Sequence, residues 1–216
     1  MVQAVFFDVD GVLLDTIPVK GEAFVDAFHG YPDRAEEIRA LHRQRGGVPR
    51  DRKIALILQD VYGVPADPAE VCRLTDVFAV RVLDRVLAAP EIAGASGALA
   101  ELHLSTCLHA VSATPESELE LVLGSRGWLS MFRSVHGVPP SKSETVRGLL
   151  AEHHYEAANC VLVGDSAEDR EAARANGVPF VFVSPSGSGG DSTDAGMVLN
   201  MVSILEVIAS AGRMGP

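Results

Sequence analysis

The sequence predicts an α/β fold, with a Rossmann-like three-layer core around a mostly parallel sheet and a small helical domain attached to it. Short apolar runs rich in Val, Phe and Leu alternate with longer helical stretches, which is typical of βα units around a parallel sheet. Between the first run and the second, about ninety residues show helical patterning and no strand. This stretch predicts a helical insert in the α/β body.

Five apolar runs are expected to form the strands of the core. They are Ala4 to Phe7, Thr106 to Val111, Arg133 to His136, Cys160 to Val163 and Phe180 to Val183. The Ser/Gly-rich segment from Ser184 to Asp191 is expected to be a mobile surface loop, because its composition favours flexible chain. Met201 to Ala209 is apolar and is expected to form a short terminal helix that packs on the core.

The insert is expected to contain four helices. Helix-breaking residues interrupt it three times, at Gly30 and Pro32, at Gly46-Gly47 and Pro49, and from Gly63 to Pro68. Its last helix, from about Ala69 to Leu87, spaces apolar side chains at threes and fours. We therefore expect a core domain of residues 1–15 and 90–216 and a helical cap domain of residues 16–89, joined by two linkers that form a hinge.

Composition narrows the class of protein and its partners. The 216 residues are 47% hydrophobic, enough to bury one large domain or one domain with a small companion. A net charge of -11 disfavours nucleic acid polymers and anionic membrane surfaces as partners. The chain shows neither a signal sequence nor a membrane-spanning run, and its three cysteines (Cys72, Cys107 and Cys160) are expected to be reduced core thiols, so we expect a cytoplasmic protein.

Two carboxylates directly follow the first expected strand. While the backbone stays extended, Asp8 and Asp10 project to the same side of the chain. Carboxylates that lie this close repel each other unless one takes a proton or a cation lies between them, and hard oxygen ligands suit Mg²⁺. Gly11 then lets the chain turn. The alternative is that Asp and Gly serve here only as ordinary turn residues at a strand end.

Two other expected strands also end in polar side chains. One runs into Ser112-Ala113-Thr114 and the other into Gly164-Asp165-Ser166. In an open parallel sheet, ligands bind outside the carboxyl ends of the strands, so an acid, a hydroxyl and an acid are expected to converge there. Further on, Asp169 and Ser166 also form a capping box for the expected helix from Ala167 to Asn176, and for Asp169 both roles can coexist.

Lys142 begins an expected helix that runs to about His153. A lysine at this position is electrostatically unfavourable, because the N-terminus of a helix already carries partial positive charge. Its presence indicates a use for the charge. The alternative is a solvated surface lysine, the commoner fate of this residue type.

These residues occur in the order and approximate spacing of the four motifs of the haloacid dehalogenase superfamily. The motifs are Asp8-Val9-Asp10-Gly11-Val12, Ser112, Lys142 and Gly164-Asp165-Ser166-x-x-Asp169. The chain resembles the phosphatase branch with a small helical cap, the group of phosphoglycolate phosphatases and beta-phosphoglucomutases. The resemblance covers nearly the whole chain, because the helical insert is similar to that cap.

The resemblance implies a Mg²⁺-dependent phosphatase that hydrolyses a small phosphate monoester through an aspartyl-phosphate. Asp8 would be the nucleophile, and Asp10 the general acid that later activates water. Ser112, the Ala113 N–H and Lys142 would hold and neutralise the phosphoryl group; Asp8, the Asp10 carbonyl and Asp165 would bind Mg²⁺; Asp169 would lie in the outer shell or orient Lys142. Asp10 disfavours dehalogenation, because a halide leaving group needs no proton.

Two departures from the family pattern affect fine positioning of the substrate. Ala113 stands where relatives often have Asn or Gly, and Ser143 stands where many have Pro. Neither removes a charge that the mechanism needs. A phosphomutase on the same scaffold is an alternative, and a catalytically silent binding module is another, although the acids whose loss would mark such a module are present. Whether the chain is a monomer or a homodimer stays open.

The densest basic cluster of this acidic chain lies in the insert, from His42 to Lys53. Arg50 and Lys53 are three residues apart and share a helix face, and the segment resembles a Gly-Gly-x-Ser-Arg-x-x-Lys pattern of some relatives, with Pro49 in place of Ser. We expect both side chains to reach toward an anionic or polyhydroxylated leaving group. The alternative is a solvated helix face with a surface mixture of charges.

Overall fold

The chain forms two compact units in a computed structural model that describes residues 2–183, 196–198, 201 and 203–211. The first unit comprises Met1–Asp15 and Pro90–Pro216, and the second comprises Thr16–Ala89. The first is an α/β unit and the second is helical. We call them the α/β unit and the helical unit.

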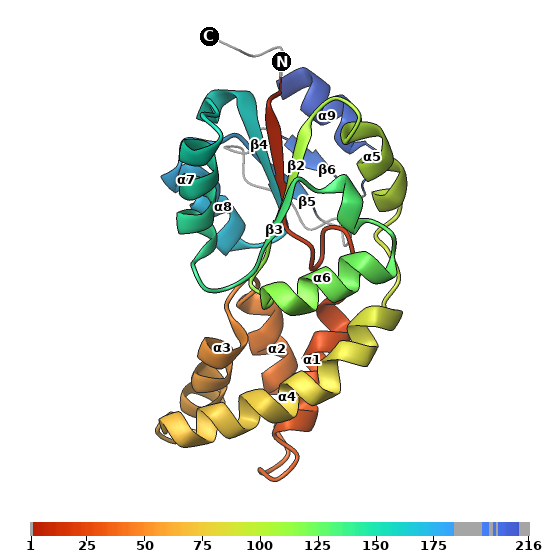
Figure 1. The fold of residues 1–216 in the computed structure, drawn as a ribbon. Helices are drawn as coiled ribbons and strands as arrows, with labels where there is room; N and C mark the ends of the chain where they lie inside the picture. Colours follow the sequence, from red (N-terminus) through yellow and green to blue (C-terminus); the bar gives the residue numbers. More distant parts are fainter. Residues whose placement is uncertain (1, 184–195, 199–200, 202, 212–216) are drawn as a thin grey trace. The chain divides into compact units, whose positions relative to one another are not determined.

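The α/β unit is built on a parallel sheet with the strand order β3-β2-β1-β4-β5-β6 (Figure 1). Its strands are β1 (Ala4–Phe7), β2 (Cys107–Val111), β3 (Ser134–His136), β4 (Cys160–Gly164), β5 (Phe180–Val183) and β6 (Gly196–Val198). All neighbouring strands pair in parallel. The predicted fold class and the five predicted strands are confirmed.

The sixth strand was not predicted from the sequence. β6 pairs through Gly196, Met197 and Val198 with the outer side of β5. Three residues that include a glycine give no period-two pattern, so only the pairing identifies them as a strand. The loop predicted from Ser184 to Asp191 lies outside the described residues.

Helices cover both faces of this sheet, with α7 and α8 on one face and α5 and α9 on the other (Figure 1). The helices are α5 (Ala95–Leu102), α6 (Glu116–Ser125), α7 (Lys142–Glu152), α8 (Ala167–Ala175) and α9 (Ile204–Ala211), with short 3-10 turns at Leu129–Met131 and Ala157–Asn159. The predicted terminal helix is confirmed, although it begins three residues later and ends two residues later than expected.

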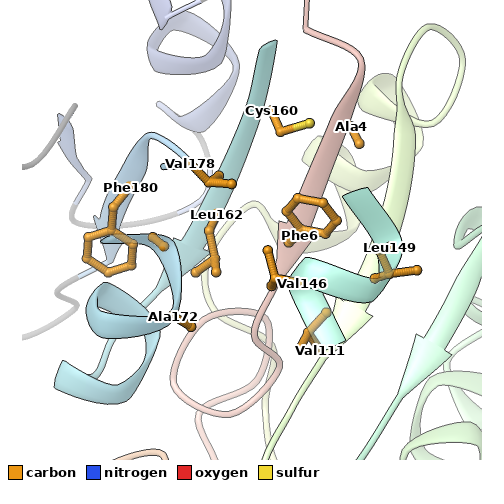
Figure 2. Packing of buried hydrophobic residues seen from close by; sticks show 11 residues of the cluster. Ala4, Phe6, Val111, Val146, Leu149, Cys160, Leu162, Ala172, Val178 and Phe180 are labelled. Carbon is orange, nitrogen blue, oxygen red and sulfur yellow. The ribbon is translucent and has the colours of Figure 1, made fainter. Parts of the chain in front are cut away.

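The core beneath α7 and α8 shows why these strands lie at the centre of the unit. Phe6 of β1 and Leu162 of β4 point to the same face, where Val146 of α7 and Ala172 of α8 pack against them (Figure 2). All four are at most 2% exposed. Burying a side chain the size of Phe or Leu contributes about 1.5–3 kcal/mol, so this layer fixes the helices on the sheet.

The register of the central strands brings their carboxyl ends to one edge. Phe7 of β1 pairs with Ala110 of β2 on one side and with Val163 of β4 on the other. The three strands therefore end within one residue of the same level, β1 at Phe7, β2 at Val111 and β4 at Gly164. This arrangement places Asp8 and the ends of β2 and β4 together.

The helical unit contains the four helices predicted for the insert. They are α1 (Ile17–Ala27), α2 (Ala35–Gln44), α3 (Arg50–Leu56), which continues into a π-helical segment (Ile57–Val61), and α4 (Pro68–Ala88). The Asp67 side chain caps α4 by accepting from the N–H groups of Ala69 and Glu70. Phe24 of α1 stacks on Phe78 of α4, with ring centroids 4.2 Å apart.

The three cysteine thiols are free, but they are not all core residues. Cys160 is buried and Cys107 is half-buried, whereas Cys72 is exposed. The prediction of a core thiol is wrong for Cys72, because it lies two helix positions from the buried Leu74 and therefore on the opposite side of α4. Within the part of the chain that the structure describes, no helix has the length and apolar character that crossing a membrane requires.

Candidate active site

Asp8 lies at the end of β1, where the last main-chain bond of the strand fixes it. Its N–H donates to the Val163 carbonyl oxygen at 2.9 Å, and its carboxylate Oδ1 accepts from the Val9 N–H at 2.7 Å. The second oxygen, Oδ2, lies 2.9 Å from the Lys142 ammonium. Burial raises the pKa of Asp8 to about 7, although Lys142 opposes that shift. A carboxylate this strongly desolvated needs a cation to remain charged.

Lys142 is the first residue of α7, and its side chain turns into the unit. Ser141 and Glu144 form the capping box that begins this helix. The ammonium lies 2.9 Å from Asp8 Oδ2 and 2.5 Å from Asp169 Oδ1, and the residue is only 7% exposed. Burial disfavours the ammonium, but the carboxylates of Asp169 and Asp8 outweigh it and raise the pKa of Lys142. The alternative of a solvated lysine is therefore wrong.

Asp169 serves two partners at once, as the sequence allowed. Its Oδ2 accepts from the Ser166 N–H at 3.1 Å and from the Ser166 hydroxyl at 2.5 Å, which completes the capping box of α8. Its Oδ1 accepts from Lys142. Gly164 makes room for this carboxylate, because a Cβ there would lie 2.3 Å from the Asp169 Cβ. Both oxygens of Asp169 are thus engaged in holding α8 and Lys142.

Three carboxylates gather at this edge of the sheet. Single oxygens of Asp8, Asp165 and Asp169 all lie within 4.8 Å of one another. Burial, and then the charges of Asp8 and Asp169, raise the pKa of Asp165 well above its ordinary value. Such a cluster is costly without a cation, and hard carboxylate oxygens are the donors that Mg²⁺ prefers. The residues therefore fit a magnesium ion.

The Asp10 carboxylate contacts a hydroxyl-bearing turn after β2. Its Oδ2 accepts from the Thr114 hydroxyl at 3.0 Å and from the Ser112 hydroxyl at 3.4 Å. The Ser112 hydroxyl in turn accepts from the Thr114 N–H at 3.2 Å. Gly11 follows with a φ of 79°, so the chain leaves the extended conformation directly after Asp10. The two motif aspartates thus have different partners.

Two residues of this site, Thr114 and Gly164, had no predicted role of their own. The Thr114 hydroxyl lies closer to the Asp10 carboxylate than the Ser112 hydroxyl does. In the sequence, the only sign of this role is that Thr114 is a second hydroxyl residue two positions after Ser112. Gly164 belongs to a motif, and the close approach of Asp169 gives the reason for the residue type. Ala113 lies in the turn between Ser112 and Thr114, and the use of its N–H stays a prediction.

Arg50 and Lys53 lie on α3 of the helical unit, as predicted. The Arg50 guanidinium lies 5.2 Å from the centroid of the Phe78 ring, and Arg50 is half-buried. Lys53 is only 3% exposed; its ammonium lies 3.2 Å from His42 Nδ1 and 5.6 Å from the Phe24 ring centroid. The alternative of a solvated helix face is wrong for Lys53, because its side chain is buried.

These features define a class of hydrolases with a parallel α/β sheet. The features are an aspartate at a strand end, a hydroxyl-bearing turn, a buried lysine and a cluster of carboxylates. The family model described as "haloacid dehalogenase-like hydrolase" matches residues 2–177. The chain belongs to this family. The predicted resemblance is therefore confirmed, and so is the prediction of an enzyme.

Relatives from several bacteria are similar over nearly the whole chain. A phosphoglycolate phosphatase from Synechococcus elongatus is 29% identical over 187 residues, 84% of this chain and 83% of that protein. Among solved structures, CbbY from Rhodobacter sphaeroides in complex with phosphate has a TM-score of 0.79 at 20% identity, covering 97% of this chain and 100% of the other. A putative beta-phosphoglucomutase from Thermotoga maritima has a TM-score of 0.69 at 22% identity, covering 96% and 99%.

Proposed function

We propose that this protein is a cytoplasmic, Mg²⁺-dependent phosphatase that hydrolyses a small-molecule phosphate monoester through an aspartyl-phosphate on Asp8. The observation that carries the proposal is the buried ion triad in which the Lys142 ammonium lies between Asp8 and Asp169. This triad supplies a carboxylate nucleophile and a fixed positive charge at the carboxyl edge of the sheet. The phosphatase among the sequence relatives supports the same reaction class.

Asp8 is the proposed nucleophile. Its backbone is held by β4, and its two carboxylate oxygens have different partners, the Val9 N–H and Lys142. Attack of one oxygen on phosphorus forms the Asp8–phosphate bond and breaks the bond from phosphorus to the leaving oxygen. Positioning and charge neutralisation supply most of the catalysis in phosphoryl transfer.

Asp10 is the proposed general acid and base. The Thr114 and Ser112 hydroxyls hold its carboxylate, so a proton on the carboxyl group has a fixed direction. In the first step Asp10 gives that proton to the departing oxygen. In the second step it takes a proton from the attacking water, whose bond to phosphorus replaces the Asp8–phosphate bond, so inorganic phosphate and free Asp8 result. The Ser112 hydroxyl, the Ala113 N–H and Lys142 are proposed to hold the phosphoryl oxygens.

Asp8, Asp165 and the Asp10 carbonyl are the proposed ligands of Mg²⁺. Asp169 belongs to the same carboxylate cluster, but its oxygens bond Lys142 and Ser166, which suits an outer-shell role. When bound, Mg²⁺ would neutralise carboxylate and phosphate charge and polarise the phosphoryl group. It would also reconcile an acidic chain with an anionic substrate, because the local charge is then offset.

The helical unit is the proposed cap domain, and Arg50 and Lys53 are proposed to contact the leaving group. Two cations on one face of α3 support an anionic or polyhydroxylated group there. The substrate is proposed to be a sugar phosphate or a similar metabolite. Nucleic acid polymers are excluded from the proposal because of the net charge of -11.

The test is a hydrolysis screen with Mg²⁺ over sugar phosphates, nucleoside monophosphates, phosphoglycolate and amino-acid phosphates. We expect inorganic phosphate to be released from at least one ester, with loss of activity in Asp8→Asn and reversible loss on chelation. Asp8→Asn keeps the shape of the side chain, so loss of activity in this variant reports the lost carboxylate and not a change of fold. Turnover at the wild-type level in Asp8→Asn would refute the nucleophile. Isomerisation of the substrate without phosphate release would favour the phosphomutase instead.

A further inference from the structure

A chain of hydrogen-bonded side chains joins β2 to β3 in the α/β unit. His109 of β2 pairs in register with Ser134 of β3, and its Nδ1 lies 2.7 Å from the Ser134 hydroxyl oxygen. The same oxygen lies 2.7 Å from Nε2 of His136. On its other side, His109 Nε2 lies 3.3 Å from the Tyr155 hydroxyl. One serine hydroxyl therefore links two imidazole rings.

The Ser134 hydroxyl has one proton and two lone pairs, so it donates to at most one of the two imidazoles and accepts from the other or from both. In each case the hydroxyl oxygen bonds both rings. Burial, and then the charges of His153, His136 and Arg133, lower the pKa of His109 to about 4, so His109 is neutral near pH 7.

Three aromatic rings face His109. The centroid of the Phe6 ring of β1 lies 5.6 Å from that of His109. Tyr155 contacts the ring edge-on, with centroids 5.8 Å apart, and its hydroxyl also forms a hydrogen bond with Cys107. The His153 ring of the segment after α7 lies 5.3 Å away. His109 is completely buried, and these contacts hold its ring against the Ser134 hydroxyl, which also bonds His136.

The main chain that follows Ser134 supports the turn next to Asp10. The His136 carbonyl oxygen accepts from the Ser112 N–H at 3.0 Å, and the Val138 N–H donates to the Thr114 carbonyl oxygen at 3.3 Å. Between them, Gly137 approaches the turn so closely that a Cβ would lie 2.4 Å from the Thr114 oxygen. The end of β3 and this turn are thus joined at three consecutive positions.

We propose that His136 is a positioning residue of the active site: the Ser134 hydroxyl holds its imidazole, and its main chain holds the turn that orients Asp10. The inference rests on the proposed function, in which Asp10 and Ser112 act on the substrate. A shift at His136 moves the hydroxyls of Ser112 and Thr114, which donate to Asp10. Small displacements of catalytic groups lower turnover more than they weaken substrate binding.

The experiment compares Ser134→Val with Ser134→Thr. Both replacements are β-branched, have nearly the same shape and suit a strand, but only threonine keeps the hydroxyl. We expect Ser134→Val to lower kcat roughly ten-fold with KM changed less than about two-fold, whereas Ser134→Thr stays within about two-fold of the wild type. His136→Phe keeps a ring without its nitrogens and is expected to lower kcat in the same way. Thermal unfolding of each variant shows that the compared proteins are folded.

Hydrogen exchange of the Ser112 amide gives a readout that does not depend on activity. We expect this amide to exchange faster in Ser134→Val than in Ser134→Thr, because its acceptor at His136 has moved. Equal kcat values for the valine and threonine variants, or wild-type kcat in His136→Phe, would overturn the inference. If the wild type hydrolyses no ester, the proposed function fails, and the exchange rate of the Ser112 amide alone tests the link from Ser134 to the turn. Different rates in Ser134→Val and Ser134→Thr support this link, and equal rates overturn it.

Discussion

Among the residues that the structure describes, each unit buries one lysine and one histidine, but their partners differ. In the α/β unit, Lys142 lies between two carboxylates, and His109 lies apart from it among hydroxyls. In the helical unit, Lys53 and His42 contact each other, with Lys53 Nζ 3.2 Å from His42 Nδ1. The same two residue types therefore make two different electrostatic arrangements.

The partner atoms determine the protonation of the pair in the helical unit. The Ile17 carbonyl oxygen, 3.1 Å from His42 Nε2, only accepts, so that nitrogen carries the proton. His42 Nδ1 is then an acceptor for the Lys53 ammonium. This pair holds one positive charge, and the ring faces of Phe24 and Phe78 receive cations from α3. Lys142, by contrast, is neutralised by its neighbours, so removing either lysine tests a different kind of site.

The largest effect is expected for Lys142→Met. This change leaves Asp8 and Asp169 as buried carboxylates without their cation, and unfolding free energy should fall by about 3–5 kcal/mol without Mg²⁺. Loss of the charge that stabilises the transferring phosphoryl group should lower kcat by about 10²–10³-fold. Chemical denaturation and steady-state kinetics measure the two effects. Wild-type turnover in a folded Lys142→Met protein would contradict the triad as catalytic machinery.

The next effect is a loss of stability in acid that originates at His109. Its pKa is about 4 in the folded chain and about 6.5 in the unfolded chain, so the unfolded state binds the proton first as pH falls. Neutral His109 therefore contributes about 3 kcal/mol to the free energy of unfolding above about pH 6.5. This contribution is lost as the pH falls from about 6.5 to about 4. Denaturation of the wild type and of His109→Gln at pH 7 and near pH 4 measures it. Parallel pH dependences of the two proteins would count against this assignment.

The edge of the sheet could be predicted from sequence because its geometry is simple. Residues that directly follow parallel, in-register strands leave the sheet at one level, so the order of strands and polar residues along the chain is enough to group Asp8, Ser112 and Asp165. Lys142 could be recognised because its charge conflicts with the start of a helix. Its contact with Asp169 was an implication of the family resemblance; spacing alone could not predict it, since these residues lie 27 positions apart on different helices.

The contacts that the sequence did not predict depend on strand register, on the position of a turn or on side-chain packing. The contact between His109 and Ser134 arises only from the pairing of β2 with β3. The contact of Asp10 with the Thr114 hydroxyl depends on where the turn after β2 lies relative to the end of β1, which spacing along the chain does not show. Burial of Lys53 depends on tertiary packing, which a basic run in a sequence does not reveal.

Smaller effects are expected in the helical unit. Lys53→Met fills the same space with an apolar chain, and His42 keeps its hydrogen bond to Ile17, so the free energy of unfolding should change by about 1 kcal/mol or less. If Lys53 contacts the leaving group, kcat/KM should fall about ten-fold for esters with an anionic leaving group and less for neutral ones. Parallel losses on both kinds of ester would contradict that role.

The smallest expected effect belongs to Arg50→Ala. The guanidinium is half-buried over Phe78, so its loss removes a cation–π contact of about 0.5–1 kcal/mol and one positive charge from the face that it shares with Lys53. We expect a rise in KM of a few-fold with kcat unchanged, because this contact would act equally on substrate and transition state. Arg52→Ala, an exposed guanidinium of the same helix, is the matched control. An unchanged KM across all esters in Arg50→Ala would remove this residue from substrate recognition. Lys53 would then be the one proposed substrate-binding cation of the helical unit, in contrast to Lys142 of the α/β unit, which is bound by carboxylates.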